Sequence, residues 1–192
     1  MFRYRALVAL LSLLATSCTF NLAPVHEAYP AKWRPLRSAG SSSCQDFVGI
    51  YDAMGERAQP MPNGANTPRL LSIVGLIRTA DAAYASLEAA YVSIQLAQDG
   101  SARMAALNSA KRPIVVAGMS EPLSCSGGGL VRDFTRSSYA DGNSHDSHSH
   151  VTLSLTHDSA LVVHVTGGSN TSDLLSDSKQ NHDLFYRFTR SP

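Results

Sequence analysis

The sequence predicts a mainly β protein, built as a single antiparallel β-barrel or curved meander of about eight or nine strands with one short helix. Short apolar segments separated by Gly, Asn, Asp and Ser turn signals fill the second half of the chain. Charged residues are only 16% of the sequence, which is typical of exported β proteins. Because only one helix is expected, an alternating βαβ arrangement is excluded.

The first half of the folded domain contains the expected helix. Phe47–Tyr51 has the composition of a first strand, and a polar, proline-rich loop follows over residues 55–68. Leu70–Ile77 is apolar throughout, and periodicity alone leaves open whether it is a buried strand or a short helix. The alanine-rich residues 79–90 predict a helix with Thr79 as its N-cap.

The remaining segments indicate antiparallel strands. Val92–Leu96 alternates apolar and polar residues, and Asp99-Gly100 is a hairpin signal because glycine accepts a positive φ. Ser101–Leu107 is the returning strand. The further expected strands are Ile114–Ala117, Leu130–Thr135 after a triple-glycine turn, Val151–Thr156, Ala160–Thr166 and Leu184–Thr189.

Two features resemble lipocalin-like barrels. Gly49-Ile50-Tyr51 resembles the Gly-x-Trp strand that opens that family, with Tyr51 where the family has Trp. Arg187 or Arg190 stands near the last strand, where the family has an Arg that packs over the aromatic ring. The resemblance implies a barrel and, as one functional alternative, a carrier of a small apolar ligand; a shared fold does not establish that function.

The N-terminus has the composition of a secretory signal. Arg3 and Arg5 precede nine residues, Ala6–Leu14, that are all apolar except one serine. A membrane-spanning helix needs about 20 apolar residues, so this run is too short to be one. Small residues and Cys18 follow, which resembles the lipobox of bacterial lipoproteins. An ordinary signal peptide cut near this position is the alternative.

The lipobox resemblance implies a signal peptide over residues 1–17, cleavage before Cys18, and attachment of lipid, including palmitate, at that residue. It also implies a cell-envelope location with the membrane as partner. Thr19, rather than aspartate, favours the outer membrane with the domain facing the periplasm. Residues 18–43 are expected to be a flexible tether and residues 44–192 a globular β domain. Trp33 could contact the lipid interface or the domain.

Cys44 and Cys125 are expected to form a disulfide. A secretory signal implies an oxidising compartment, where two remaining thiols usually pair. The bridge would close a loop of about 80 residues. Two unpaired, buried thiols are the alternative.

Histidines are concentrated between residues 145 and 164. Matching the apolar faces of Val151–Thr156 and Ala160–Thr166 needs a three-residue loop, which places Thr152 opposite His164. His150 and His164 then lie diagonally on the polar face, with His148 or Asp146 as a further ligand for zinc or copper. An exposed His-rich loop over residues 137–149 or a pH-responsive surface are the alternatives.

The remaining sequence limits the function. Net charge is +1 and no cluster of Lys and Arg occurs, so we expect no nucleic-acid partner. No G-x-S-x-G or H-E-x-x-H motif is present. We therefore expect an envelope lipoprotein that is not an enzyme, has no cofactor, and has a structural or interaction role with an envelope protein partner. A ligand carrier and a His-mediated metal-binding lipoprotein are the alternatives.

Overall fold

The computed structural model describes residues 18–21, 25–38, 42–59, 67–77, 79–114, 122–140, 143–172 and 176–192. The expected signal peptide, residues 1–17, and most of the expected strand Ile114–Ala117 lie outside the described residues. The architecture is mainly β, as predicted, and the described strands form two sheets. Neither sheet closes on itself, so the barrel is not confirmed.

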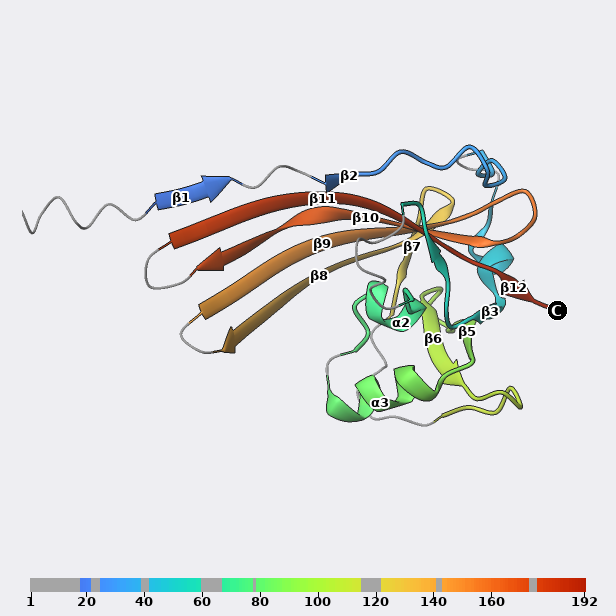
Figure 1. Cartoon of the computed structure of the whole chain (residues 1–192). Coiled ribbons are helices and arrows are strands. Elements are labelled where there is room, and N and C mark those ends of the chain that lie inside the picture. Colours follow the sequence, from blue (N-terminus) through green and yellow to red (C-terminus); the bar gives the residue numbers. More distant parts are fainter. Residues whose placement is uncertain are drawn as a thin grey trace, which may run out of the picture.

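The large sheet has the strand order β1-β11-β10-β9-β8-β7, and the short strands β2 and β4 also pair with β11. Its strands are β1 (Cys18–Asn21), β2 (Val25–His26), β4 (Glu56–Arg57), β7 (Ser124–Ser126), β8 (Gly129–Ala140), β9 (Asn143–Leu155), β10 (Leu161–Ser172) and β11 (Ser176–Phe188). Figure 1 shows β8 to β11 as a long curved sheet that projects well beyond the rest of the domain.

These four strands are longer than predicted. Residues 137–140 and 143–149 of the expected loop are strand, and β9 pairs with β8 and β10 there. The sequence offers no apolar alternation there, but a ladder of backbone hydrogen bonds does not need one. The polar segment therefore continues the sheet beyond the core.

The small sheet has the order β12-β3-β5-β6 and packs under the large sheet. Its strands are β3 (Gly49–Asp52), β5 (Tyr91–Leu96), β6 (Ala102–Leu107) and β12 (Arg190–Ser191). The turn between β5 and β6 contains Gly100 with φ of 79°, as the Asp-Gly signal predicts. Arg190 pairs with Tyr51, and its guanidinium carbon lies 5.8 Å from the tyrosine ring centroid. The arginine–aromatic contact of the lipocalin-like resemblance is therefore present, without a closed barrel.

Among the described residues, two α-helices and one 3-10 helix accompany the sheets. The undecided apolar segment contains α2 (Leu70–Ile73), and the predicted helix is α3 (Ala80–Glu88). The Thr79 side chain accepts a hydrogen bond from the Ala82 N–H at 3.1 Å, so the predicted N-cap is confirmed. The 3-10 helix η1 (Cys44–Phe47) precedes β3, where the first strand was expected to begin at Phe47.

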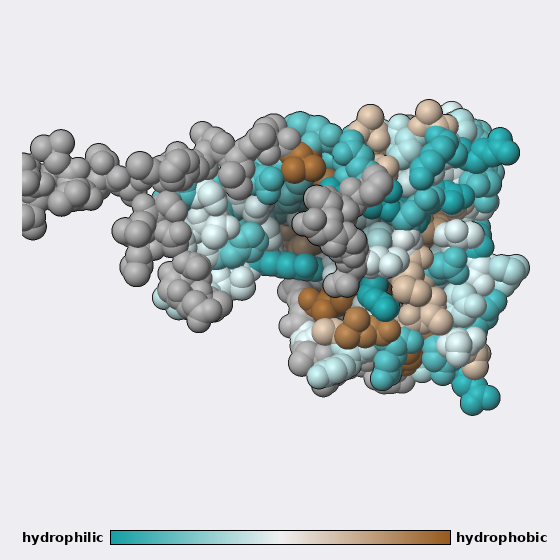
Figure 2. Space-filling view, in the orientation of Figure 1, coloured by the Kyte–Doolittle hydropathy of each residue, from teal (hydrophilic) through white to brown (hydrophobic). Residues whose placement is uncertain are grey.

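The hydrophobic core lies between the large sheet, the small sheet and α2. Phe188 and Leu153 from the large sheet, Tyr51 and Ile94 from the small sheet, and Leu70 from α2 are all at most 1% exposed. Figure 2 shows that the projecting part of the large sheet is mostly hydrophilic on the visible face. The core therefore holds the proximal half of the long strands, and the distal half extends from it.

Residues 18–43 were expected to be a flexible tether, and this is wrong for residues 25–38, which are held against the domain. Residues 25–38 lie along the large sheet, where the Arg37 N–H donates to the Leu155 carbonyl at 2.8 Å. Trp33 is only 5% exposed and its ring contacts Tyr29 edge-on, so it packs on the domain. Backbone hydrogen bonds and the buried side chain of Trp33 hold this segment. Such contacts need no regular spacing of apolar residues, so the sequence shows no helix or strand pattern here.

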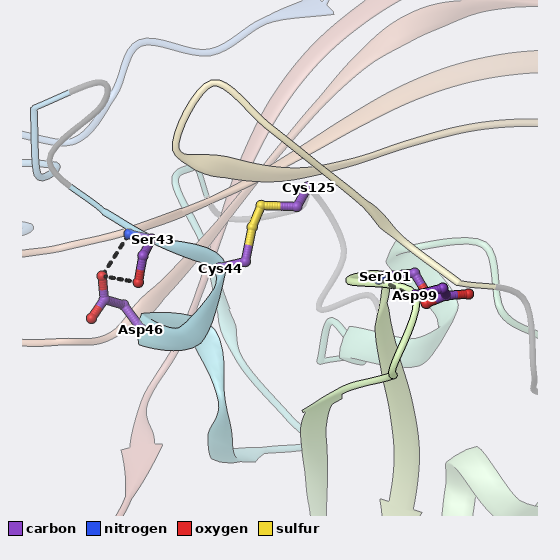
Figure 3. The surroundings of a disulfide bond; sticks show 6 residues. All are labelled: Ser43, Cys44, Asp46, Asp99, Ser101 and Cys125. Atoms are coloured by element: carbon purple, nitrogen blue, oxygen red, sulfur yellow. Dashed lines mark hydrogen bonds between the residues drawn. A yellow bond between two sulfur atoms is a disulfide. The ribbon is translucent and has the colours of Figure 1, made fainter.

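Cys44 and Cys125 are paired as predicted, with their Cα atoms 6.1 Å apart. Figure 3 shows the bridge running from the start of η1 to the short strand β7. The disulfide therefore joins the segment that leads into the small sheet to the large sheet. Ser43 and Asp46 close the first turn of η1, where the Ser43 N–H donates to the Asp46 carboxylate at 2.7 Å.

Candidate functional site

The distal half of the long sheet has two faces that differ in chemistry. Side chains alternate across a strand, so residues 134 and 136 of β8 share the face that leads into the core with odd-numbered residues of β9 and β10. We call this the inner face. The opposite, outer face carries His148, His150 and His164.

A groove of about 370 Å³ runs along the inner face where the sheet leaves the core. Apolar, serine and ionisable side chains share its walls. Its lining residues are Ser72, Ile73, Phe134, Arg136, His145, Ser147, Ser149, Val165, Ser169, His182, Leu184 and Tyr186. A second hollow of about 490 Å³ continues from it past α2 and also includes Arg57 and Arg69. We call the first hollow the inner groove.

A buried ion pair fixes the proximal end of the second hollow. The Arg57 Nε lies 2.5 Å from the Glu27 carboxylate, whose side chain is fully buried. The same carboxylate accepts the Phe185 N–H at 3.2 Å. The N-terminal segment, β4 and β11 are therefore held together by one carboxylate, and a buried carboxylate needs such partners.

Burial changes the protonation of two groups in the inner groove. It lowers the pKa of His182, with a smaller opposing effect from Asp183, so the neutral imidazole is favoured. Burial also raises the pKa of the Tyr186 phenol, against the opposing charge of Arg57. These two groups are therefore neutral hydrogen-bonding groups near pH 7.

No carboxylate is among the described residues that line these two hollows, whereas three arginines and two histidines are. Arg136 is exposed, donates to the Ser72 carbonyl at 2.8 Å, and places its guanidinium carbon 5.1 Å from the Phe134 ring centroid. The inner face is thus suited to anionic or hydrogen-bond-accepting groups beside an apolar floor.

The predicted register of the His-bearing hairpin is confirmed. Thr152 pairs with His164 and His150 with Thr166, and the Thr156 N–H donates to the Ala160 carbonyl at 3.0 Å. Leu153 and Val163, on the opposite face, are both 0% exposed. The apolar faces therefore set this register.

The metal site predicted from His148, His150 and His164 is not assembled. The His150 Nδ1 lies 2.8 Å from Asp133 on β8, whereas the His164 Nε2 lies 2.6 Å from Asp183 on β11. The two rings thus bind carboxylates on opposite sides of the hairpin. His164 also stacks on Phe185, with ring centroids 4.2 Å apart. Within the described residues, no three His, Cys, Asp or Glu side chains group as metal ligands.

The predicted lipidation residue lies at the distal end of the long sheet. β1 begins at Cys18 and pairs in parallel with β11, with Cys18 opposite Ser176. Figure 1 shows β1 beside the far end of β11, remote from the small sheet. No helix among the described residues is long and apolar enough to cross a membrane.

Sequence reasoning missed the inner groove. Phe134 and Arg136 lie on the same face of β8, but the expected strand ended at Thr135, which left Arg136 outside it. His145 and Ser147 oppose this part of β8 only because the polar segment forms strand. The available signal was the two-residue spacing of these side chains across a polar hairpin.

Comparison with protein-family profiles, curated proteins and solved structures gave no match.

Proposed function

We propose that this chain is a bacterial envelope lipoprotein, anchored through Cys18, whose β domain has a non-catalytic interaction role at the membrane periphery. The observation that carries the proposal is the lipobox-like sequence that ends at Cys18. The position of that residue supports it, because β1 starts there and leads the chain directly onto the edge of the long sheet. An anchor at Cys18 would hold the distal end of the sheet close to the bilayer.

The proposed location is the outer membrane, with the domain facing the periplasm. Thr19 follows the anchor, and in lipoproteins of this resemblance a residue other than aspartate favours outer-membrane sorting. The proposed role is interaction with an envelope protein, because the polar distal sheet extends beyond the core and presents two accessible faces. Neither the membrane anchor nor this interaction role requires a nucleic acid or a catalytic group.

Membrane fractionation of the Cys18→Ser variant tests the anchor. Wild-type protein should incorporate palmitate, lose residues 1–17 and sediment with membranes. The Cys18→Ser variant should take up no palmitate and should stay uncleaved or become soluble. Ser17→Ala is the matched control, because it keeps a small residue before the cysteine. A Cys18→Ser protein that still incorporates palmitate and sediments with membranes contradicts the proposal.

A carrier of a small apolar ligand is a second candidate, favoured by the apolar floor of the inner groove. Ile73, Val165 and Leu184 line this hollow, whose volume of about 370 Å³ falls in the range of small-molecule sites. Native mass spectrometry of protein extracted from cells should then show a bound lipid that is lost in Leu184→Arg. A ligand-free wild-type mass would remove this candidate without affecting the anchor proposal.

A further inference from the structure

The two edges of the long sheet differ in how much of their backbone is paired with short strands. The β11 edge is covered by β1 at residues 176–179, by β2 at residues 182–183 and by β4 at residues 186–187. Between these short strands, the Phe185 carbonyl accepts the Ala58 N–H at 2.9 Å, and the Phe185 N–H donates to the Glu27 side chain. The backbone groups of this edge are therefore occupied almost continuously.

The β8 edge is covered only at its start. β7 pairs with residues 129–131, and no described strand pairs with the outward side of residues 132–140. An uncovered strand edge presents N–H and C=O groups that can pair with another chain. The uncovered length is long enough for an added strand of ordinary size.

The hairpin at the start of β8 tells which backbone groups face outward. Gly127 and Gly128, both with positive φ, form a two-residue turn between Ser126 and Gly129. In such a hairpin the flanking pair is hydrogen-bonded, so the backbone of Gly129 points to β7. Hydrogen-bonding direction alternates along a strand, so the N–H and C=O groups of Asp133, Thr135 and Ser137 also point away from β9.

A cleft flanks each face of this edge at the same residues, 135–137. The inner cleft, of about 510 Å³, lies between β8 and the segment that contains Gly75 and Ile77. The outer cleft, of about 480 Å³, is bordered by Asp146 and His148. A strand added to β8 would direct alternate side chains into the two clefts.

Charge distinguishes the two clefts. Arg136 borders both clefts, but its guanidinium lies on the inner side, where it donates to the Ser72 carbonyl. His145 and Phe134 also line the inner cleft, and no carboxylate is among its described lining residues. Asp146 is part of the outer lining. An acidic side chain therefore fits the inner cleft, where a guanidinium can bind a carboxylate, and neutral polar side chains fit the outer cleft.

We propose that the open edge of β8 binds an extended peptide segment of a partner protein by strand addition, with an acidic side chain of that segment in the inner cleft. The proposal rests on the interaction role proposed above and names the partner class. Backbone hydrogen bonds from Asp133, Thr135 and Ser137 would supply affinity, and the two clefts would select the side chains.

Fluorescence anisotropy with the full chain in detergent tests the proposal. The probe is a fluorescein-labelled heptapeptide of alternating threonine and valine with a central glutamate. Thr135→Pro removes an outward N–H without breaking the ladder to β9, because proline is tolerated when its nitrogen faces solvent. It should weaken binding by about tenfold or more, since the ring also hinders the approach of a strand. The matched control, Thr135→Val, keeps both the N–H and the β-branched shape and should bind as wild type does.

Two further arms separate backbone pairing from charge. A probe N-methylated on alternate residues should not bind wild-type protein, which tests strand addition without a protein variant. Arg136→Gln should weaken the glutamate probe several-fold and leave a glutamine version of the probe unchanged. Thermal unfolding checks that each variant is folded.

Three outcomes would overturn the proposal. The first is no binding of the glutamate probe to folded wild-type protein. The second is unchanged affinity in both backbone tests, that is, wild-type protein binds the N-methylated probe as tightly as the unmodified one, and the folded Thr135→Pro variant binds the unmodified probe as tightly as wild type does. The third is a wild-type dimer in sedimentation that Thr135→Pro abolishes, which would assign the edge to a second copy of the chain. Palmitate labelling at Cys18 is measured separately, so loss of the anchor and loss of strand addition are distinguishable.

Discussion

The disulfide is expected to be a large part of the stability of this domain. Cys44 and Cys125 are 81 positions apart in the sequence. On the chain-entropy description, closing a loop of that length in the unfolded chain stabilises the folded state by about 4.5 kcal/mol at 25 °C. Single domains have total stabilities of roughly 5–15 kcal/mol. Removing the bridge should therefore take away a large fraction of the free energy of unfolding.

Urea unfolding of the Cys44→Ala/Cys125→Ala variant measures this contribution. The free energy of unfolding should fall by about 2–5 kcal/mol, which corresponds to a midpoint lower by roughly 1–2.5 M at a typical slope of about 2 kcal/mol/M. Wild-type protein unfolded with a thiol reductant present should match the variant, which controls for the loss of the side chains. A variant within about 0.5 kcal/mol of oxidised wild type would refute the loop-entropy reasoning.

Three further outcomes are expected. Gly167→Ala should destabilise by about 1–3 kcal/mol in urea, because its Cβ would overlap a backbone carbonyl of β9, whereas Gly168→Ala meets a side-chain amide that can move. Burial depresses the pKa of His182, so stability should fall as the pH drops below about 6.5; thermal unfolding of His182→Gln should show a weaker dependence. In hydrogen exchange by NMR, the outward Thr135 amide should exchange faster than the Phe134 amide, which points to β9; equal rates would contradict the edge assignment.

The correct predictions came from hydrophobic alternation, from local helix signals and from the cysteine count. The hairpin around residues 157–159 was predicted in its observed register, because each strand has one apolar face and a slip of one residue would expose it. The helix at Ala80–Glu88 and its Thr79 cap followed from the alanine-rich composition and the threonine that precedes it. The cysteine pair followed from the oxidising compartment that the expected signal peptide would imply.

Segments that are held mainly by backbone hydrogen bonds could not be predicted from side-chain patterns. The distal halves of β8 and β9 contain serine, histidine and aspartate in place of alternating apolar residues, so the ladder that continues through them leaves no side-chain pattern. The N-terminal segment docks through Trp33 and through backbone pairing with β11, against a background of prolines. Of the predicted barrel or curved meander, the barrel is not confirmed, because strand number and alternation do not encode whether the first and last strands meet.

The metal prediction shows where a correct register is insufficient. His150 and His164 share the outer face as expected, but each ring is hydrogen-bonded to a carboxylate on the next strand, Asp133 or Asp183. Those carboxylates become neighbours only once four strands are aligned, and the hairpin sequence alone contains neither of them. A diagonal pair of histidines is thus a candidate site only when the flanking strands are known.

The same alignment explains why the open edge of β8 is a better functional candidate than the histidine face. Beyond Phe134 and Val165 the distal sheet has few buried apolar side chains, so its order depends on backbone pairing more than on the core. β9, β10 and β11 each have pairing partners on both sides, whereas the distal half of β8 has one described neighbour. Charged residues at Asp133 and Arg136 disfavour indiscriminate pairing at this edge. An added strand with a complementary carboxylate would supply the missing hydrogen bonds and would also pair with Arg136. Among the four long strands, the one with the least backbone support is therefore also the one best suited to a specific partner.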